Sequence, residues 1–152
     1  MYAPFVEYQT EAEYRTHFER VYCTGPIETF DGIRVRFRKG RFQHDFYESS
    51  RRDGNKDRFS GDRARRMDWI LKVLKDPSAE LYQGWDKKRK KYDPDSRVAL
   101  VVNEYVVVIR LMGPDSAEFV TAYVAGAQPT GGQRKSTVDM IRSGPEWKKM
   151  NR

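Results

Sequence analysis

Cysteine and histidine are scarce in this chain of 152 residues, which has one cysteine, Cys23, and two histidines. A single cysteine excludes an internal disulfide and any zinc site built on cysteine pairs. His17 and His44 have no acidic residue at the spacing of metal ligands, so we expect neither a metal nor another cofactor. Missing disulfides are typical of a reducing compartment, which predicts a cytoplasmic protein.

Long apolar runs are also absent. The longest lies around Tyr105 to Ile109, which is the length of a strand and far short of the ~20 residues that cross a bilayer. The first ten residues lack the basic start and apolar core of a secretory signal. The sequence therefore predicts no membrane partner and no secretory leader.

Positive charge is in excess, with 29 Lys and Arg against 22 Asp and Glu and a net charge of +7. Such a balance favours a polyanionic partner, with nucleic acid ahead of an anionic membrane. The alternative is a basic protein whose charge serves only solubility. The aromatic content of 13% and the length predict one folded domain, over residues 1–125 with its core at about 30–125.

The first half of the chain has mainly helical patterns. A capping box formed by Thr10 and Glu13 opens a helix over 10–23, and alternation predicts a strand over 33–38. A short helix over 42–50 and a longer one from Ser60 to Asp76 follow.

The second half alternates like strands, and short turns between the strands indicate antiparallel neighbours. The predicted strands cover 79–85, 98–102, 105–111 and 117–124. We expect an α+β fold in which the N-terminal helices pack on one face of this four-stranded antiparallel sheet. Residues 126–152 form a basic tail that we expect to be loosely attached, with a short helix near 137–142.

Two sets of residues suit chemistry on a phosphodiester. His44 lies between Phe42 and Phe46, and an imidazole both takes up and releases protons near neutral pH. Arg63 and Arg66 are three residues apart and share one helix face, where planar guanidinium groups can hold phosphate oxygens. The alternatives are a surface histidine and a solvated helix face.

The last predicted strand carries hydroxyl groups. Thr121 and Tyr123 are two residues apart, so they share a face, on which we also expect Phe119. A face of this composition can bind a base and its phosphate. The alternative is an ordinary solvent-facing side of a sheet.

The densest basic run joins two predicted strands. It is flanked by Trp85 and Tyr92 and consists of Lys87, Lys88, Arg89, Lys90 and Lys91. Lysines and arginines bind phosphates without regard to sequence, and the aromatic rings can stack on bases. The alternative is a hairpin tip that serves solubility.

The order of these features resembles the barnase–EndoU–colicin–RelE class of small ribonucleases. A His-Asp-Phe helix, an arginine-rich helix ending in Trp69-Ile70, and a closing Phe-Val-Thr-Ala-Tyr strand are similar to its phage-associated branch. The resemblance covers about residues 30–125. It departs in histidine supply, because some members use two and this region has only His44.

The resemblance implies an endoribonuclease that needs no metal and leaves a 2′,3′-cyclic phosphate. It implies catalytic roles for His44, Arg66, Thr121 and Tyr123, with Arg63 and the basic run from Trp85 to Tyr92 binding RNA. The expected partners are single-stranded or tRNA-like RNA and, for a toxin or phage-borne effector, an acidic immunity or antitoxin protein. The alternatives are a non-catalytic nucleic-acid-binding module and an interaction protein with an acidic partner.

Overall fold

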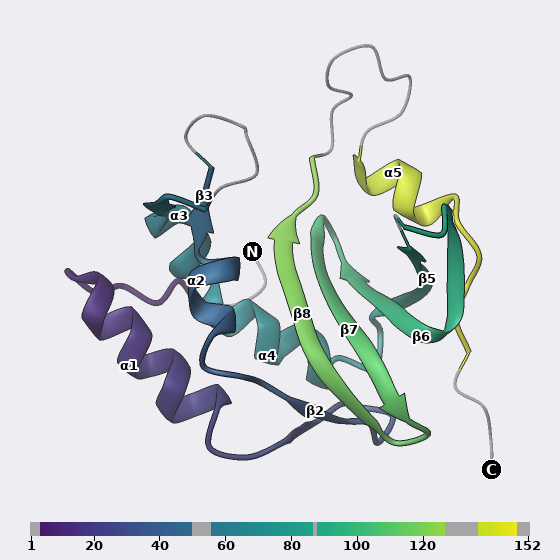
Figure 1. Cartoon of the computed structure of the whole chain (residues 1–152), viewed down its shortest axis with the longest axis horizontal. Coiled ribbons are helices and arrows are strands. Elements are labelled where there is room, and N and C mark those ends of the chain that lie inside the picture. The colour runs from purple at the N-terminus through teal and green to yellow at the C-terminus, as the bar shows by residue number, and fades with distance from the viewer. Residues whose placement is uncertain (1–3, 50–55, 87, 127–136, 149–152) are drawn as a thin grey trace.

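The computed structural model describes residues 4–49, 56–86, 88–126 and 137–148, and its fold is α+β (Figure 1). A six-stranded sheet has the strand order β1-β2-β8-β7-β6-β5, and a separate pair is formed by β3 and β4. The strands of the large sheet are β1 (Ile27–Glu28), β2 (Arg34–Arg36), β5 (Glu80–Asp86), β6 (Lys91–Val102), β7 (Tyr105–Gly113) and β8 (Ser116–Val124). The remaining elements are β3 (Tyr47–Glu48), β4 (Arg58–Phe59), α1 (Glu11–Tyr22), α2 (Arg41–Asp45), α3 (Gly61–Ala64), α4 (Met67–Lys75) and α5 (Thr137–Arg142).

The large sheet is mixed, which corrects the predicted four-stranded antiparallel sheet. The strands β5 to β8 form an antiparallel meander, but β2 adds to the edge of β8 in parallel, pairing Arg36 with Glu118. β1 then pairs antiparallel with β2. The strand predicted over 33–38 is present as β2, but its pairing with a segment about eighty residues away leaves no local signal in the sequence. The two-residue strand β1 was missed.

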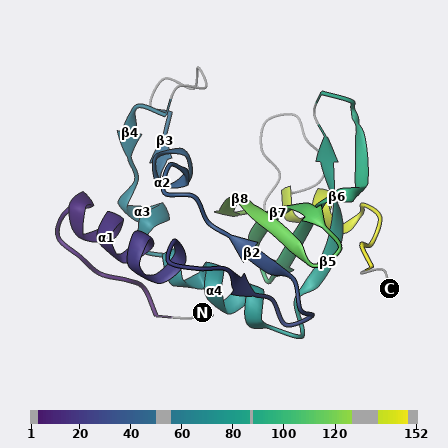
Figure 2. The same ribbon diagram turned by 60° about the horizontal axis from the view of Figure 1, so that its bottom comes forward.

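Two of the helices before the meander meet the large sheet: α2 contacts β8, and α4 packs on a face of the sheet. Helix α4 lies along one side of the sheet, against β6 and β7, and buries Met67, Ile70, Val73 and Leu74 (Figure 2). The predicted packing of all the N-terminal helices on this face is therefore wrong.

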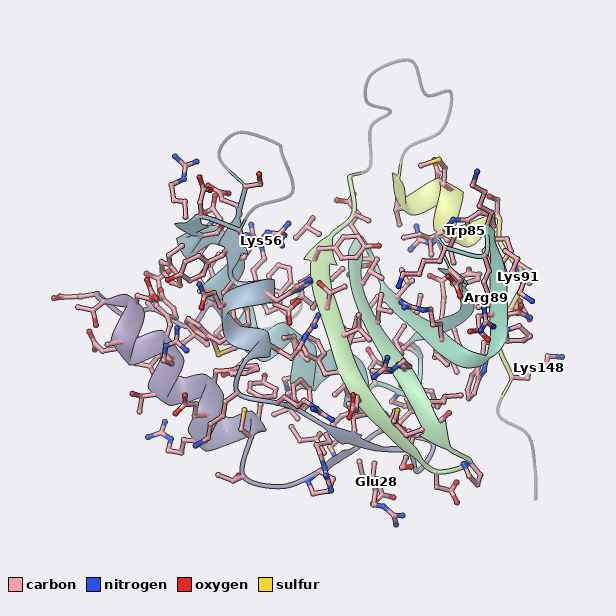
Figure 3. All side chains as sticks on the ribbon, in the orientation of Figure 1. Glu28, Lys56, Trp85, Arg89, Lys91 and Lys148 are labelled. Atoms are coloured by element: carbon pink, nitrogen blue, oxygen red, sulfur yellow. The ribbon has the colours of Figure 1, made fainter. Side chains whose placement is uncertain are left out.

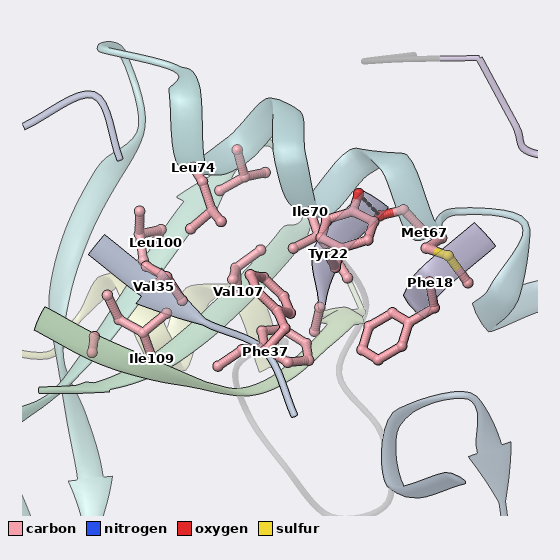
Figure 4. Close-up of a cluster of buried hydrophobic side chains, with 14 of the residues drawn as sticks. Phe18, Tyr22, Val35, Phe37, Met67, Ile70, Leu74, Leu100, Val107 and Ile109 are labelled. Atoms are coloured by element: carbon pink, nitrogen blue, oxygen red, sulfur yellow. Dashed lines mark hydrogen bonds between the residues drawn. The ribbon is translucent and has the colours of Figure 1, made fainter. Parts of the chain in front are cut away.

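Helix α1 instead packs through aromatic rings on the segment that runs from the end of β2 through α2. Phe18 is fully buried and contacts the rings of Phe37, Phe42 and Phe46 at centroid distances of 6.2, 5.9 and 5.5 Å. Tyr22 donates a hydrogen bond of 2.8 Å to the carbonyl of Met67, which ties α1 to α4 (Figure 4). Because Phe42 and Phe46 flank His44, this cluster holds α2 in place.

The predicted helix from Ser60 to Asp76 is broken into α3 and α4. Ser60 caps α3 as expected, because its hydroxyl accepts a hydrogen bond of 3.2 Å from the Arg63 N–H. The break follows at Arg65 and Arg66. The Arg65 carbonyl accepts a bond of 2.7 Å from the Val6 N–H, so a segment distant in sequence occupies a carbonyl that would otherwise continue the helix.

Three further predictions concern α2, α5 and the C-terminal tail. Helix α2 stops at Asp45, since Tyr47 and Glu48 pair with β4 and the predicted helix over 42–50 is too long. Helix α5 occupies the predicted residues 137–142. The described part of the tail is packed rather than loose, because Val138 is buried and the buried Trp147 donates a hydrogen bond of 3.0 Å to the Pro94 carbonyl.

We predict that Phe18→Ala lowers the free energy of unfolding by roughly 3–5 kcal/mol, because it leaves a cavity among aromatic rings. Thr16→Ala on the exposed side of the same helix is the control and should change stability by less than about 0.5 kcal/mol. Urea unfolding followed by tryptophan fluorescence measures both. Equal effects of the two substitutions would show that α1 is not part of the core.

Candidate functional site

A β-bulge at Val120 determines which side chains of β8 share a face. Phe119 pairs with Ile109 and Thr121 with Val108, so Val120 has no partner opposite it. Phe119 consequently points into the core, where its ring stacks on Phe37 at 4.6 Å. The prediction that Phe119 shares the face of Thr121 is wrong, because the extra residue reverses the alternation.

Helix α2 docks beside this bulge. The guanidinium group of Arg41 donates a hydrogen bond to the Val120 carbonyl. The same guanidinium lies 3.0 Å from His44 Nδ1, and Asp45 Oδ1 lies 3.2 Å from that nitrogen. His44 Nδ1 accepts a hydrogen bond from Arg41 when it carries no proton, and donates one to Asp45 when it is protonated. The tautomer of the ring therefore determines which of the two hydrogen bonds forms. The His44 side chain is 51% exposed, which leaves the ring accessible to a ligand.

Asp45 is the buried centre of this arrangement, with a side chain that is 1% exposed. Burial raises the pKa of Asp45, while Arg41 and hydrogen bonds from Thr121 and His44 oppose that rise. Asp45 Oδ2 lies 3.7 Å from Arg41 Nε, and within the described residues this oxygen has no hydrogen bond. We refer to Arg41, His44, Asp45 and Thr121 as the His44 cluster.

A cleft of about 150 Å³ lies beside the His44 cluster. It is lined by Arg63, Arg66, Tyr105, Ala122, Tyr123 and Val124, and we call it the arginine cleft. Arg63 connects the two, because its Nη1 lies 3.4 Å from the Asp45 carbonyl oxygen. A neighbouring hollow of about 240 Å³ shares Arg66, Tyr105 and Val124 with the cleft.

Arg66 is held by two kinds of contact. Its Nη1 donates a bond of 2.6 Å to the Asp62 carbonyl, and its guanidinium lies 5.4 and 5.5 Å from the rings of Phe5 and Trp69. These contacts fix the charge at the wall of the arginine cleft. The guanidinium group of Arg66 is therefore preorganised. Unlike Arg63, which contacts the Asp45 carbonyl, Arg66 adjoins the His44 cluster only through the arginine cleft.

Lys56 is a cation near the site that pattern analysis missed. Burial, followed by the charge of Arg63, lowers the pKa of Lys56, while Asp45 raises it. Figure 3 labels Lys56 beside the β3–β4 pair, close to α2. The polar stretch around Lys56 has the composition of a loop, so no periodic signal marks this lysine.

The basic run between β5 and β6 lies away from the His44 cluster. Trp85 and Tyr92 are 49% and 36% exposed, and their rings meet edge to face at 5.2 Å. Lys88, Arg89, Lys90 and Lys91 are exposed beside them, and Lys87 lies outside the described residues. Figure 3 shows Arg89 and Lys91 across β7 and β8 from Lys56. The hairpin is thus a separate surface.

The structure brings together several predicted residues and, besides Lys56, adds Arg41 and Asp45. His44 and Thr121 meet through Asp45, while Arg63, Arg66 and Tyr123 line the adjoining arginine cleft. Arg41 and Asp45 were missed, although their i,i+4 spacing around His44 on a short helix is the signal that could have identified them. His17 is held elsewhere, with Nε2 at 2.9 Å from Asp68 and Nδ1 at 2.9 Å from the Tyr8 hydroxyl.

Comparison with known proteins adds nothing to this geometry, because no family model, curated protein or solved structure matches the chain. Among the described residues, no group of three or more histidine, cysteine or acidic side chains could hold a metal ion. In the same part of the chain, no helix is long and apolar enough to cross a membrane.

The buried carboxyl of Asp45 predicts a pH dependence of stability. Because this pKa is raised, there is a pH range above the ordinary pKa of 3.8 in which Asp45 is protonated in the folded protein and ionised in the unfolded chain. The folded state then binds more protons, so the Asp45 contribution to stability falls as pH rises through this window. The unfolding free energy of Asp45→Asn minus that of the wild type should therefore become more positive as pH rises.

Urea unfolding at a series of pH values measures this difference. Asp62→Asn, at a side chain that is 79% exposed, is the control. If the Asp45→Asn difference were independent of pH, Asp45 would not be buried as described.

Proposed function

We propose that this protein is an endoribonuclease that cleaves RNA without a metal ion, using the RNA 2′-hydroxyl as the nucleophile. The observation that carries the proposal is an accessible imidazole, His44, held between a guanidinium and a buried carboxylate and adjoining a cleft with two more arginines. A base, an acid and fixed cations are what this reaction requires.

In the proposed reaction, the residues of the His44 cluster have different roles. When His44 Nδ1 donates to Asp45, Nε2 is left as an acceptor for the 2′-hydroxyl proton. His44 takes up the proton of the 2′-hydroxyl, the O2′–P bond forms and the P–O5′ bond breaks. The departing O5′ then takes a proton from the imidazolium or from water. Asp45 acts as a positioning residue, since its buried carboxylate holds the ring without contacting the substrate.

The guanidinium groups stabilise the negative charge of the transition state. Arg41 and Arg63 flank His44 and Asp45, and Arg66 is held at the wall of the same cleft. Their charges oppose the negative charge that develops on the phosphorane. In this proposal Thr121 and Tyr123 contribute hydroxyl groups at the edge of β8, where they contact the phosphate or the departing oxygen.

The antiparallel meander of β5 to β8, with α2 and α4 preceding it, supports the proposed likeness to the barnase–EndoU–colicin–RelE class. The parallel β2 is a departure from the expected sheet. We propose by the same likeness that the protein acts in the cytoplasm on single-stranded or tRNA-like RNA. A role as a toxin or phage-borne effector, held in check by an acidic immunity protein, belongs to the same proposal.

A non-catalytic RNA-binding module is the second candidate. The exposed Trp85 and Tyr92 beside Lys88 to Lys91 favour it, since such a hairpin binds RNA with no need of the His44 cluster. The two functions differ in what His44 does, because a binding module loses little when that residue is replaced.

Cleavage in the presence of EDTA is the direct test of the proposed chemistry. Purified protein incubated with total RNA and EDTA should produce fragments that end in a 2′,3′-cyclic phosphate, as end-group analysis or mass spectrometry detects. Cleavage that depends on added divalent ions would contradict the proposal. Intact RNA with retained binding would favour the second candidate.

Replacement of the two histidines should have unequal effects. His44→Ala should lower the turnover of RNA by about 10²-fold or more, which is the usual contribution of a general acid–base group, while RNA binding stays close to wild type. His17→Ala is the matched control, because His17 is 11% exposed and paired with Asp68, and it should leave turnover nearly unchanged below the unfolding transition. Single-turnover kinetics separates cleavage from binding, and a silent His44→Ala would exclude the assigned site.

A further inference from the structure

A row of arginines crosses the sheet on the face opposite α4. The register pairs Arg36 of β2 with Glu118 of β8, Glu118 with Arg110 of β7, and Arg110 with Arg97 of β6. Directly paired residues lie on the same face, so these four side chains form one line across four strands. Arg34 of β2 and Arg38, two residues past the end of β2, extend the line. We call Arg34, Arg36, Arg38, Arg97 and Arg110 the arginine face.

Positive charge on this face is only partly compensated. Glu118 accepts hydrogen bonds of 2.8 Å from Arg38 and 3.0 Å from Arg110, and these bonds hold the pKa of Glu118 below its usual range. Within the part of the chain that the structure describes, Arg34, Arg36 and Arg97 form no ion pair. Arg97 and Arg110 are also like charges directly across from each other, an unfavourable pairing that a bound anion would relieve.

The arginine face is open to a large ligand. Figure 1 shows no helix in front of the lower parts of β7 and β8, the strands that carry Arg110 and Glu118, whereas α4 lies behind the sheet. A hollow of about 340 Å³ is bordered by Arg34, Arg36 and Glu118, together with Met112, which is 58% exposed. The face therefore offers guanidinium groups for phosphates and an apolar side chain beside them.

Strand β5 comes close to this row through a glycine. A Cβ at Gly84 would lie 2.5 Å from the Arg97 Cβ, so a larger residue could not occupy that position without moving Arg97. The register of β5 on β6 shifts between Gln83 and Gly84. The backbone of β5 thereby supports Arg97 at the end of the row without covering it.

The arginine face is continuous with the His44 cluster. The bulge at Val120 places Thr121 on the same side of β8 as Glu118, three residues along. On the neighbouring strand, β2 leads through Arg38 to Arg41 at the start of α2. An extended polyanion that crosses the arginine face therefore arrives at His44 from the β2 side.

We propose that the arginine face binds the phosphate backbone of single-stranded RNA and leads it to the His44 cluster. The proposal rests on the proposed function for the identity of the ligand. Arginine suits the role because its planar fork matches phosphate oxygens and never loses its charge. Residues two apart on β2 lie about 6.6 Å apart along the strand, so successive phosphates of an extended chain can be held in turn. A single strand also presents its bases to Met112 and to the guanidinium planes.

The test uses a short single-stranded 2′-O-methyl RNA, which cannot be cleaved, so binding is measured apart from catalysis. The variant combines Arg36→Gln with Arg97→Gln, and the matched control combines Arg20→Gln with Lys75→Gln on helices α1 and α4. Both variants remove two exposed or half-exposed charges, but the control removes them elsewhere. Fluorescence anisotropy at several salt concentrations gives the affinity and its salt slope.

The expected result is a weaker affinity for the arginine-face variant, with a salt slope smaller by about 0.7 for each phosphate that the protein no longer neutralises. The control variant should bind with the slope of the wild type. Glu118→Gln removes the one carboxylate of the row and should tighten binding. Circular dichroism of each variant confirms that the fold is retained.

Three results would overturn the inference. One is an arginine-face variant whose salt slope of RNA binding equals that of the control. This result would leave the proposed function intact, because cleavage in EDTA tests that function separately. Another is weaker binding by Glu118→Gln than by the wild type. The last is displacement of the RNA by polyglutamate of equal charge, if that displacement depends on Arg36 and Arg97 as RNA binding does. The face would then be a docking surface for an acidic protein.

Discussion

The docking of α2 against the bulged edge of β8 is the contact on which the candidate site depends. A bulge leaves the Val120 carbonyl without a partner in the sheet, and the Arg41 guanidinium takes the place of that partner by donating to it. The same arginine contacts His44 and Asp45, so one side chain joins the sheet, the imidazole and the buried carboxylate. Without the bulge, Thr121 would face the core and would not reach Asp45.

The core and the site are connected through the aromatic rings around α2. A helix of five residues has little stability of its own, because nucleation is costly and few hydrogen bonds repay it. Phe42 and Phe46 anchor α2 by burying their rings against Phe18 of α1. The polar residues between them, His44 and Asp45, are thereby held at the surface of β8. The packing of aromatic rings in the core thus determines where the His44 imidazole lies.

Local patterns allowed part of the fold and site to be predicted, while long-range pairings did not. The capping box at Thr10 identified α1 because its signal lies within one turn, and the helix over 137–142 was also predicted. The parallel addition of β2, the break at Arg65 and the bulge at Val120 each depend on a distant segment of backbone. His44, Thr121 and the Arg63–Arg66 pair were identified by residue type. Asp45 was not, because its burial is visible only once α2 is docked.

The claim that the RNA itself supplies the nucleophile is tested most directly by a single atom of the substrate. An RNA oligonucleotide that is cleaved at one linkage is compared with the same oligonucleotide carrying deoxyribose on the 5′ side of that linkage, with EDTA present. If the RNA 2′-hydroxyl is the nucleophile, the deoxyribose linkage stays intact while the unmodified one is cleaved. Cleavage of the modified linkage at the wild-type rate would show that water attacks the phosphate, which would contradict the role assigned to the His44 cluster.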